Sequence, residues 1–246
     1  MPTTPVGPSQ GFSRLNPDRR DPSYLVLAPL VASLAARVDE RLAGRSGLRV
    51  IDVGCGNKPY ESILAPYAGS YRGVEPEPSP YVDDLGTLEE LPYEDASVDV
   101  VLCTQVLEHV QDPRRAVREI HRVLAPGGTV FASTHGVFVY HPDPPTSDQD
   151  YWRWTEAGLR KLFNDEAEWA RMAVDRQGEV LAALAFVGCQ YVDAALGRTP
   201  LRRMSPRVVS GVNAVTERLD RKFPPRARDG AAGSMSANFL LVAEKP

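Results

Sequence analysis

The sequence predicts an α/β fold with a doubly wound, mostly parallel sheet, and three features favour it. Residues 48–59 join a short apolar run to a Gly-Cys-Gly turn and a proline that could stand in the first turn of a helix. Residues 71–74 form a second short strand, which ends in Glu75. Further apolar runs alternate with segments of helical spacing. Strands that lead through glycine turns into helices place ligand sites at the carboxyl ends of such sheets.

The expected elements follow one another along the chain. Residues 24–42 have apolar side chains at helical spacing, and Gly44 and Gly47 end that helix. The strands are expected at residues 48–53, 71–75, 81–85, 98–103, 129–133, 169–176 and 238–243. The later helices are expected at residues 58–67, 113–124, from Thr155 onward, at 179–196 and within 198–228.

Composition limits the class of protein. The 246 residues suit one large domain, and 43% hydrophobic residues are enough for a core. A net charge of −4 argues against nucleic-acid binding. The three cysteines, Cys55, Cys103 and Cys189, show neither zinc spacing nor a disulfide framework, so we expect a reducing, cytoplasmic setting.

The two ends of the chain carry less pattern. Residues 1–22 are rich in proline and lack the apolar run of a signal peptide, so we expect a flexible arm before a single domain at 23–246. The longest apolar stretch, 180–196, contains Gln190 and Asp193 and is short for a membrane span. No membrane span is therefore expected.

The glycine turn at Gly54 and Gly56 does not fit a dinucleotide site. That pattern requires a third glycine for close helix packing, and Pro59 stands in its place. Asp52, just before the turn, adds a carboxylate that suits a cationic ligand better than a phosphate. Glu75 lies about 20 residues beyond the turn, where an acid hydrogen-bonds ribose hydroxyls in related folds.

Five short motifs occur in a fixed order along residues 48–134. They are D-x-G-x-G at 52–56, the acid Glu75, L-P-Y at 91–93, L-E-H-V at 107–110 and A-P-G-G at 125–128. Together they closely resemble the class I S-adenosylmethionine-dependent methyltransferases that act on small molecules. The resemblance implies a Rossmann-like sheet of seven strands with the last strand antiparallel. It also implies an N-terminal helix at 23–45 that covers the cofactor and a helical insertion at 178–230 between strands six and seven.

The resemblance implies S-adenosyl-L-methionine as the cofactor. The residues expected to bind it are Asp52, Gly54, Cys55, Gly56, Glu75, Leu88, Gln105 and Val106. The family usually has an acid before strand four that binds the adenine amino group, and here Thr87 stands at that position. Asp83 or Asp84 could take its place, and the backbone of Leu88 could supply a further contact.

Candidate acceptor-side residues follow strands four and five. A hydroxyl acceptor needs a base, for which histidine is suited near neutral pH. His109 and His135 are the catalytic candidates, whereas His121 lies on a helix away from this rim. The residues expected to bind the substrate are Tyr24, His141, Tyr151, Trp152 and Trp154. A metal site of His135, His141, Asp143, Asp148 and Asp150 is a less favoured alternative, and no metal is expected.

We therefore expect methyl transfer to oxygen or nitrogen of a small molecule. The D-Y-W-R-W-T run at 150–155 resembles methyltransferases of glycan or natural-product assembly, which suggests a sugar, a glycan or a natural-product intermediate. A cofactor-binding regulatory or scaffolding protein and an NAD-dependent oxidoreductase are the alternatives. The basic insertion at 178–230 could pack on the domain, form a homodimer or make peripheral membrane contact.

Overall fold

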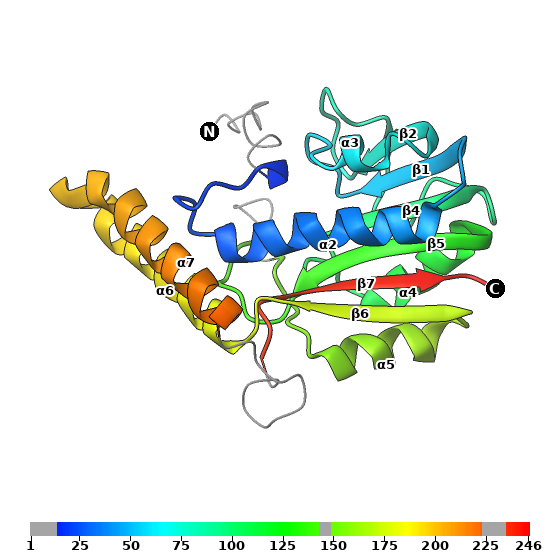
Figure 1. Ribbon diagram of the computed structural model, residues 1–246. Helices are drawn as coiled ribbons and strands as arrows, with labels where there is room; N and C mark the ends of the chain where they lie inside the picture. Colours follow the sequence, from blue (N-terminus) through cyan, green and yellow to red (C-terminus); the bar gives the residue numbers. More distant parts are fainter. Residues whose placement is uncertain (1–13, 143–148, 223–234) are drawn as a thin grey trace.

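A seven-stranded sheet forms the centre of the computed structural model, which describes residues 14–142, 149–222 and 235–246 (Figure 1). The strand order is β3-β2-β1-β4-β5-β7-β6. The strands are β1 (Leu48–Val53), β2 (Ala68–Glu75), β3 (Asp84–Leu85), β4 (Val98–Thr104), β5 (Leu124–His135), β6 (Arg171–Gln177) and β7 (Asn238–Glu244). Strands β1 to β5 pair in parallel, and β7 pairs antiparallel with both β5 and β6. The predicted Rossmann-like fold with an antiparallel last strand is confirmed.

Helices cover both faces of this sheet. They are α2 (Tyr24–Leu42), α3 (Glu61–Leu64), α4 (Pro113–Val123), α5 (Glu156–Glu166), α6 (Val180–Gly197) and α7 (Ser205–Lys222), with a 3₁₀ helix η1 (Pro200–Met204) before α7. Helix α2 and Leu64 pack with Val50, Val100 and Leu102 on one face. Helices α4 and α5 pack with Ile51 and Val101 on the other. Because the central strands are buried on both faces, they are almost continuously apolar.

Several elements differ from the expected bounds, and β2 begins three residues earlier, at Ala68. The helix expected at 58–67 is only the four residues of α3, because Lys58 has a φ of 55°, which no right-handed helix contains. The strand expected at 81–85 is reduced to Asp84–Leu85. Strand β5 is longer than expected, because Leu124 already pairs with Val98 ahead of the Pro-Gly-Gly turn.

The segment before α2 contacts the rest of the molecule from residue 14 onward. The side-chain amide of Asn213 in α7 donates to the backbone oxygens of Arg19 and Asp21. Arg19 forms an ion pair with Glu217 at 2.7 Å. We expected a flexible arm up to residue 22. Arg19 and Asp21 instead contact α7, and Leu15 packs against the core cluster that contains α2. Residues 1–13 are outside the described residues.

Helices α6 and α7 form a hairpin that extends from one end of the sheet (Figure 1). The hairpin lies between β6 and β7 in the sequence, as expected for the insertion at 178–230, of which residues 223–230 are outside the described part. Its base packs through Ala182, Ala183 and Phe186 against Leu25 and Val26 of α2. Among the described helices, α6 alone is long and apolar enough to cross a membrane, by length and composition only. One such helix is weak evidence for a span.

Candidate functional site

Two loops meet at the carboxyl rim of the central strands. Gly54 after β1 has a φ of 70°, and a Cβ atom there would lie 2.3 Å from Cγ2 of Val106, in the loop after β4. Only glycine satisfies both demands. Gly56 has a φ of 53°, and nothing within 4 Å would obstruct a Cβ. Gly54 therefore packs directly against Val106, whereas the backbone at Gly56 has space beside it for a ligand.

Glu75 lies at the end of β2 beside this turn. Its Oε1 accepts a hydrogen bond from the backbone N–H of Gly56 at 2.7 Å. The structure thus joins the acid expected to bind ribose to the glycine turn. A carboxylate has acceptor capacity for further donors, so this position suits a pair of hydroxyl groups.

Asp52 is buried at the end of β1, where Oδ2 accepts a hydrogen bond from the Tyr71 hydroxyl at 2.7 Å. Its Oδ1 has no hydrogen-bond partner among the described residues. Burial raises the pKa of this carboxyl to about 7, against the opposing effect of the Tyr71 hydrogen bond. An unpartnered buried carboxylate oxygen beside a glycine turn fits a cationic ligand, such as an amino group or a sulfonium. Tyr71 was not identified from the sequence, where it reads as an ordinary strand residue.

The acids near Thr87 already have strong partners. Asp83 accepts hydrogen bonds from Lys58 at 2.6 Å and from the backbone N–H of Gly73 at 2.7 Å. Asp84 pairs with Arg72 and accepts a hydrogen bond from the Tyr93 hydroxyl. These contacts lower the pKa of both carboxyls. Their geometry gives them a role in bracing the β2–β3 edge, in place of the adenine contact that we considered for them.

The remaining residues expected to bind cofactor differ in what they offer. The Cys55 thiol is buried under the edge of β2, and burial raises its pKa to about 12. Leu88 packs in the core cluster that contains α4. Gln105 has a φ of 61°, and its amide donates to Ser133 and to Asn238. Its amide nitrogen is therefore held at β5 and β7, whereas Val106 contacts the glycine turn.

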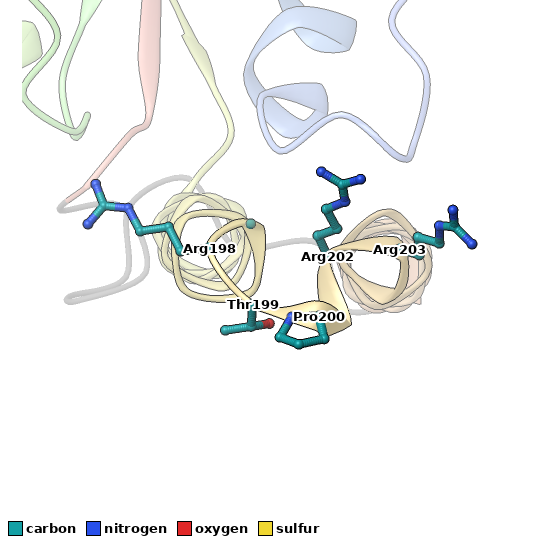
Figure 2. A pocket seen from close by; sticks show the side chains of 6 residues that line it. Arg198, Thr199, Pro200, Arg202 and Arg203 are labelled. Atoms are coloured by element: carbon teal, nitrogen blue, oxygen red, sulfur yellow. The ribbon is translucent and has the colours of Figure 1, made fainter.

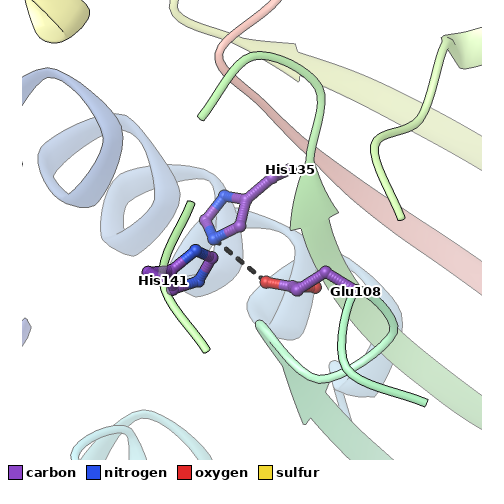
Figure 3. Close-up of side chains that lie close together, drawn as sticks. All are labelled: Glu108, His135 and His141. Atoms are coloured by element: carbon purple, nitrogen blue, oxygen red, sulfur yellow. Dashed lines mark ion pairs between the residues drawn. The ribbon is translucent and has the colours of Figure 1, made fainter. Parts of the chain in front are cut away.

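A group of Glu108, His135 and His141 lies on the same rim (Figure 3). His135 Nε2 is 3.0 Å from Glu108 Oε1, and the Thr134 hydroxyl donates to Glu108 Oε2 at 2.8 Å. Glu108 and His135 are almost wholly buried. Burial alone would raise the pKa of Glu108, but its contacts with His135 and Thr134 outweigh it and lower that pKa. Sequence reasoning selected His135 but missed Glu108, whose place in L-E-H-V gave no sign that it pairs with strand five.

His141 is the partly exposed member of this group, with 31% of its side chain accessible. Its ring centroid is 4.9 Å from that of His135 and 5.0 Å from that of His109. Its Nδ1 lies 3.1 Å from the Val139 carbonyl oxygen and 3.5 Å from Oδ2 of Asp150. Burial and the neighbouring His135 lower the pKa of His141. Because both neighbours of Nδ1 are acceptors, the proton belongs on Nδ1 and the lone pair on Nε2.

Asp150 supports this orientation from inside the protein. Its carboxylate is buried and binds Arg153 at 2.6 Å and the backbone N–H of His141 at 2.8 Å. These contacts lower its pKa to about 2, although burial opposes them. His109 is held differently, since its Nδ1 donates to the Gln149 carbonyl oxygen at 2.6 Å.

The aromatic residues of D-Y-W-R-W-T lie over the L-E-H-V loop. The backbone N–H groups of Tyr151 and Trp152 both donate to the Glu108 carbonyl oxygen, and the Trp152 indole donates to that of Val110. Tyr151 is 46% exposed and Trp152 37% exposed. Trp154 packs against the core, at a ring distance of 5.8 Å from Trp152. Tyr151 and Trp152 are thus the pair available to an acceptor.

Tyr24, a candidate, and His121, which was not one, lie elsewhere. The Tyr24 hydroxyl donates to Glu217 of α7, and its side chain lines a cavity of about 470 Å³ between α2 and the hairpin. This differs from the expected place among the acceptor residues, because Glu217 holds the hydroxyl. His121 is bound to the Glu168 carbonyl oxygen and packs on Trp169, in keeping with a structural role.

Of the alternative metal site, His135 and His141 lie together, and they are joined by Glu108, which was not among the expected ligands. The ligand atoms of Glu108, His135 and His141 lie within 4.8 Å of one another. Asp150 is held by Arg153, while Asp143 and Asp148 are outside the described residues.

Comparisons with known proteins agree with this geometry. Residues 51–132 match the family model of the methyltransferase domain. This match covers one third of the chain and agrees with the resemblance to the class I S-adenosylmethionine-dependent methyltransferases. A ubiquinone biosynthesis O-methyltransferase of Pseudomonas aeruginosa is 36% identical over 115 residues, which cover 39% of this chain and 48% of that protein. A probable S-adenosylmethionine-dependent methyltransferase of Mycolicibacterium smegmatis is 38% identical over 120 residues, covering 44% and 47%. The aligned segments thus span about half the length of these curated relatives.

Solved structures share the fold over a larger part of the chain. The [4+2]-cyclase SpnF superposes with a TM-score of 0.52 and 22% identity, covering 88% of this chain and 81% of its own. Phosphoethanolamine N-methyltransferase 2 of Haemonchus contortus, in complex with S-adenosyl-L-methionine, gives a TM-score of 0.54 at 16% identity and covers 96% and 60%. At these identities the likeness concerns the fold of the methyltransferase domain.

Proposed function

We propose that the protein transfers a methyl group from S-adenosylmethionine to an oxygen atom of a small molecule. This proposal rests on one observation: acidic side chains suited to the cofactor and a histidine group suited to proton transfer lie on the same rim of the sheet. Buried or half-buried carboxylates, Asp52 and Glu75, flank the glycine turn, and the L-E-H-V loop joins that turn to the histidine group. Such a rim can hold a cationic cofactor on one side and an acceptor on the other.

The residues of the cofactor side have distinct roles in this proposal. Glu75 receives the ribose hydroxyls, and Oδ1 of Asp52 receives the amino group. The backbone of Gly56 approaches the cofactor without a Cβ in the way. When bound, S-adenosylmethionine supplies an electrophilic methyl group on a sulfonium sulfur. The protein's main task is then to align the acceptor and exclude water.

We assign the proton transfer to His141. Its Nε2 takes the proton of the acceptor hydroxyl, while Val139 and Asp150 hold the ring through Nδ1. The acceptor oxygen forms a bond to the methyl carbon, and the electrons of the broken carbon–sulfur bond remain on sulfur. The buried Glu108 carboxylate lies within 4.8 Å and can offset the charge that His141 gains. His135 is enclosed beneath it and serves to hold Glu108.

Tyr151 and Trp152 give the acceptor its class. Exposed aromatic faces beside the proton acceptor suit a flat or ring-shaped molecule, such as a phenol or a sugar. The Pseudomonas relative is named an O-methyltransferase, which favours oxygen over nitrogen as the acceptor atom. A cofactor-binding protein without turnover is the second reading. The NAD-dependent oxidoreductase has no support from the methyltransferase match.

Calorimetry with S-adenosylmethionine and the variants Asp52→Asn and Glu75→Gln tests the cofactor site. We expect saturable binding to the wild-type protein and a loss of affinity of at least about tenfold in each variant, because each removes a charged hydrogen-bond acceptor. Leu85→Gln, at the exposed end of β3, is the control. Unchanged affinity in both variants would show that the cofactor binds elsewhere.

Turnover requires a second measurement. Labelled S-adenosylmethionine incubated with fractionated cell extract should transfer label to an acceptor in the presence of the wild-type protein. Tight cofactor binding with no labelled product in any fraction would support the second reading.

A further inference from the structure

One stripe of α6 is apolar and exposed along most of the helix. Leu181, Leu184, Val187 and Tyr191 are between 38% and 74% exposed, and their spacing of three and four residues places them on one face. The opposite stripe, with Phe186 and Cys189, is buried. The mean hydropathy of this 18-residue helix is 1.6, yet only 22% of it is buried. A core helix of such hydropathy is normally covered on all sides. Within the described residues, the exposed stripe has no covering element.

Positive charge follows directly after this stripe. Residues 198–222 contain seven basic and two acidic side chains, a net charge of +5 in a chain whose net charge is −4. Arg198, Arg202 and Arg203 spread around the turn between the helices and line a hollow of about 510 Å³ (Figure 2). None of the three forms an ion pair with a carboxylate in the described part of the chain. The hairpin therefore has an apolar face that ends in a cationic turn.

We propose that the hairpin of α6, η1 and α7 docks on a bilayer that contains anionic phospholipid. The apolar stripe of α6 enters the headgroup region, and the arginines of the turn bind lipid phosphates. Tyr191, the most exposed residue of the stripe, has the amphipathic ring that suits the boundary between headgroups and acyl chains. The helix lies on the membrane and does not cross it, since its other face packs against α7 and α2.

The charge favours a lipid surface over a second copy of the chain. A symmetric contact in which the two α6 helices run in the same direction would bring the cationic turns of two copies together, where like charges repel. An anionic bilayer neutralises the same charge. The other exposed residues of α7 are also a mixture of apolar and basic side chains, among them Val208, Val215 and Arg218.

The hairpin also connects to the acceptor side of the rim. The Phe186 ring of α6 lies 4.7 Å from that of Phe138, and Phe138 stacks on His135 at 3.6 Å. A docked hairpin would thus hold the histidine group close to the membrane surface. If the proposed methyl transfer is correct, its acceptor would be a molecule carried in or on that membrane. The docking itself does not depend on that function.

Vesicle flotation with the full-length protein tests the docking. Vesicles of phosphatidylcholine alone are compared with vesicles in which half of the lipid is phosphatidylglycerol. We expect the protein to float with the anionic vesicles only, and the bound fraction to decrease as salt screens the charges. Leu184→Gln with Tyr191→Ser, and separately Arg202→Gln with Arg203→Gln, should each lower the bound fraction about tenfold. Leu85→Gln and Arg171→Gln, exposed residues of β3 and β6, should leave it unchanged.

Two results would overturn the proposal. One is equal or absent binding to both kinds of vesicle by the wild-type protein. The other is a wild-type dimer in light scattering that Leu184→Gln with Tyr191→Ser converts to a monomer, because the stripe would then be a protein interface. Circular dichroism of each variant confirms that the fold is retained. Cofactor affinity, measured in the same samples, keeps this result separate from a failure of the proposed methyl transfer.

Discussion

A single hydrogen atom in place of a methyl group lets the loops after β1 and β4 meet at Gly54. This position combines a left-handed φ with contact to Val106, whereas Gly56 has the left-handed φ alone. Gly54 and Gly56 therefore distinguish two reasons for a glycine, the left-handed backbone and the lack of space for a Cβ atom. Backbone conformation alone costs a non-glycine residue on the order of 1 kcal/mol.

We expect Gly54→Ala to reduce the free energy of unfolding by on the order of 3 kcal/mol and Gly56→Ala by about 1 kcal/mol. The difference reflects the contact with Val106, so Gly54→Ala combined with Val106→Ala should recover part of the loss. Urea denaturation of the four proteins measures it. Equal losses in the two single variants would show that the loops move apart freely.

Asp52 links the candidate site to the pH dependence of stability. Its pKa is about 7 in the folded protein, against an ordinary value of 3.8. The folded state therefore binds the proton more tightly than the unfolded state between these values. The contribution of Asp52 to the free energy of unfolding should therefore be largest near pH 4. It should decrease as the pH rises to 7 and then remain constant.

Asp52→Asn should remove that fall, which is a few kcal/mol between pH 4 and pH 7. The measurement is the difference in free energy of unfolding between wild type and variant at several pH values, which cancels the contribution of other groups. A constant difference across this range would mean that the carboxyl titrates normally.

His141 should control turnover without controlling cofactor binding. We expect His141→Gln to lower kcat roughly 10²- to 10⁴-fold, the usual range for loss of a general base, and to leave cofactor affinity unchanged. His121→Gln is the matched control, since His121 is bound to Glu168 on the far side of α4. Because the pKa of His141 lies below 6.5, the wild-type kcat/KM should decline only as the pH drops below that value. Full activity of the variant would exclude the base.

At the scale of elements, strands and long helices were predictable from local pattern. Helix α2 has the predicted bounds, and β1 is the predicted strand, because each combines a clear apolar period with glycine terminators. The short elements were not. The positive φ of Lys58 prevents the helix from beginning at that residue, so that α3 begins at Glu61. The Lys58 side chain forms an ion pair with Asp83. A contact of this kind between distant residues leaves no local signal.

The same division holds for the candidate site. Glycine turns and acids at strand ends follow motif spacing, so Asp52, Gly54 and Glu75 could be selected from the sequence. The meeting of His141 with Glu108 depends on how a loop folds back over β4 and β5. Asn213 illustrates the same point in the hairpin, where it joins α7 to residues 19 and 21 through tertiary contact alone.

Asn213→Ala should loosen the segment before α2. The variant leaves two backbone oxygens without their donor, and we expect a loss of about 1–3 kcal/mol in stability together with faster hydrogen exchange in residues 14–24. Arg218→Ala, on the exposed side of the same helix, is the control. Exchange that rises equally in both variants would indicate general loosening of α7.

At the scale of the whole molecule, one short loop lies between the two halves of the site. Val106 of that loop contacts the glycine turn, and the Glu108 carbonyl oxygen two residues later receives the N–H groups of Tyr151 and Trp152. The acceptor-side residues thus bind to the same loop that packs against the glycine turn of the cofactor side. Because the two halves share this loop, we expect binding at one half to affect binding at the other.

The consequence concerns the order of events in catalysis. A cofactor bound at the glycine turn would fix the position of the loop that carries the acceptor residues. We therefore expect ordered binding, in which the cofactor binds before the acceptor and S-adenosylhomocysteine leaves last. Product inhibition by S-adenosylhomocysteine should then be competitive with S-adenosylmethionine and noncompetitive with the acceptor. Val106→Ala, which weakens the contact, should shift the pattern toward random order.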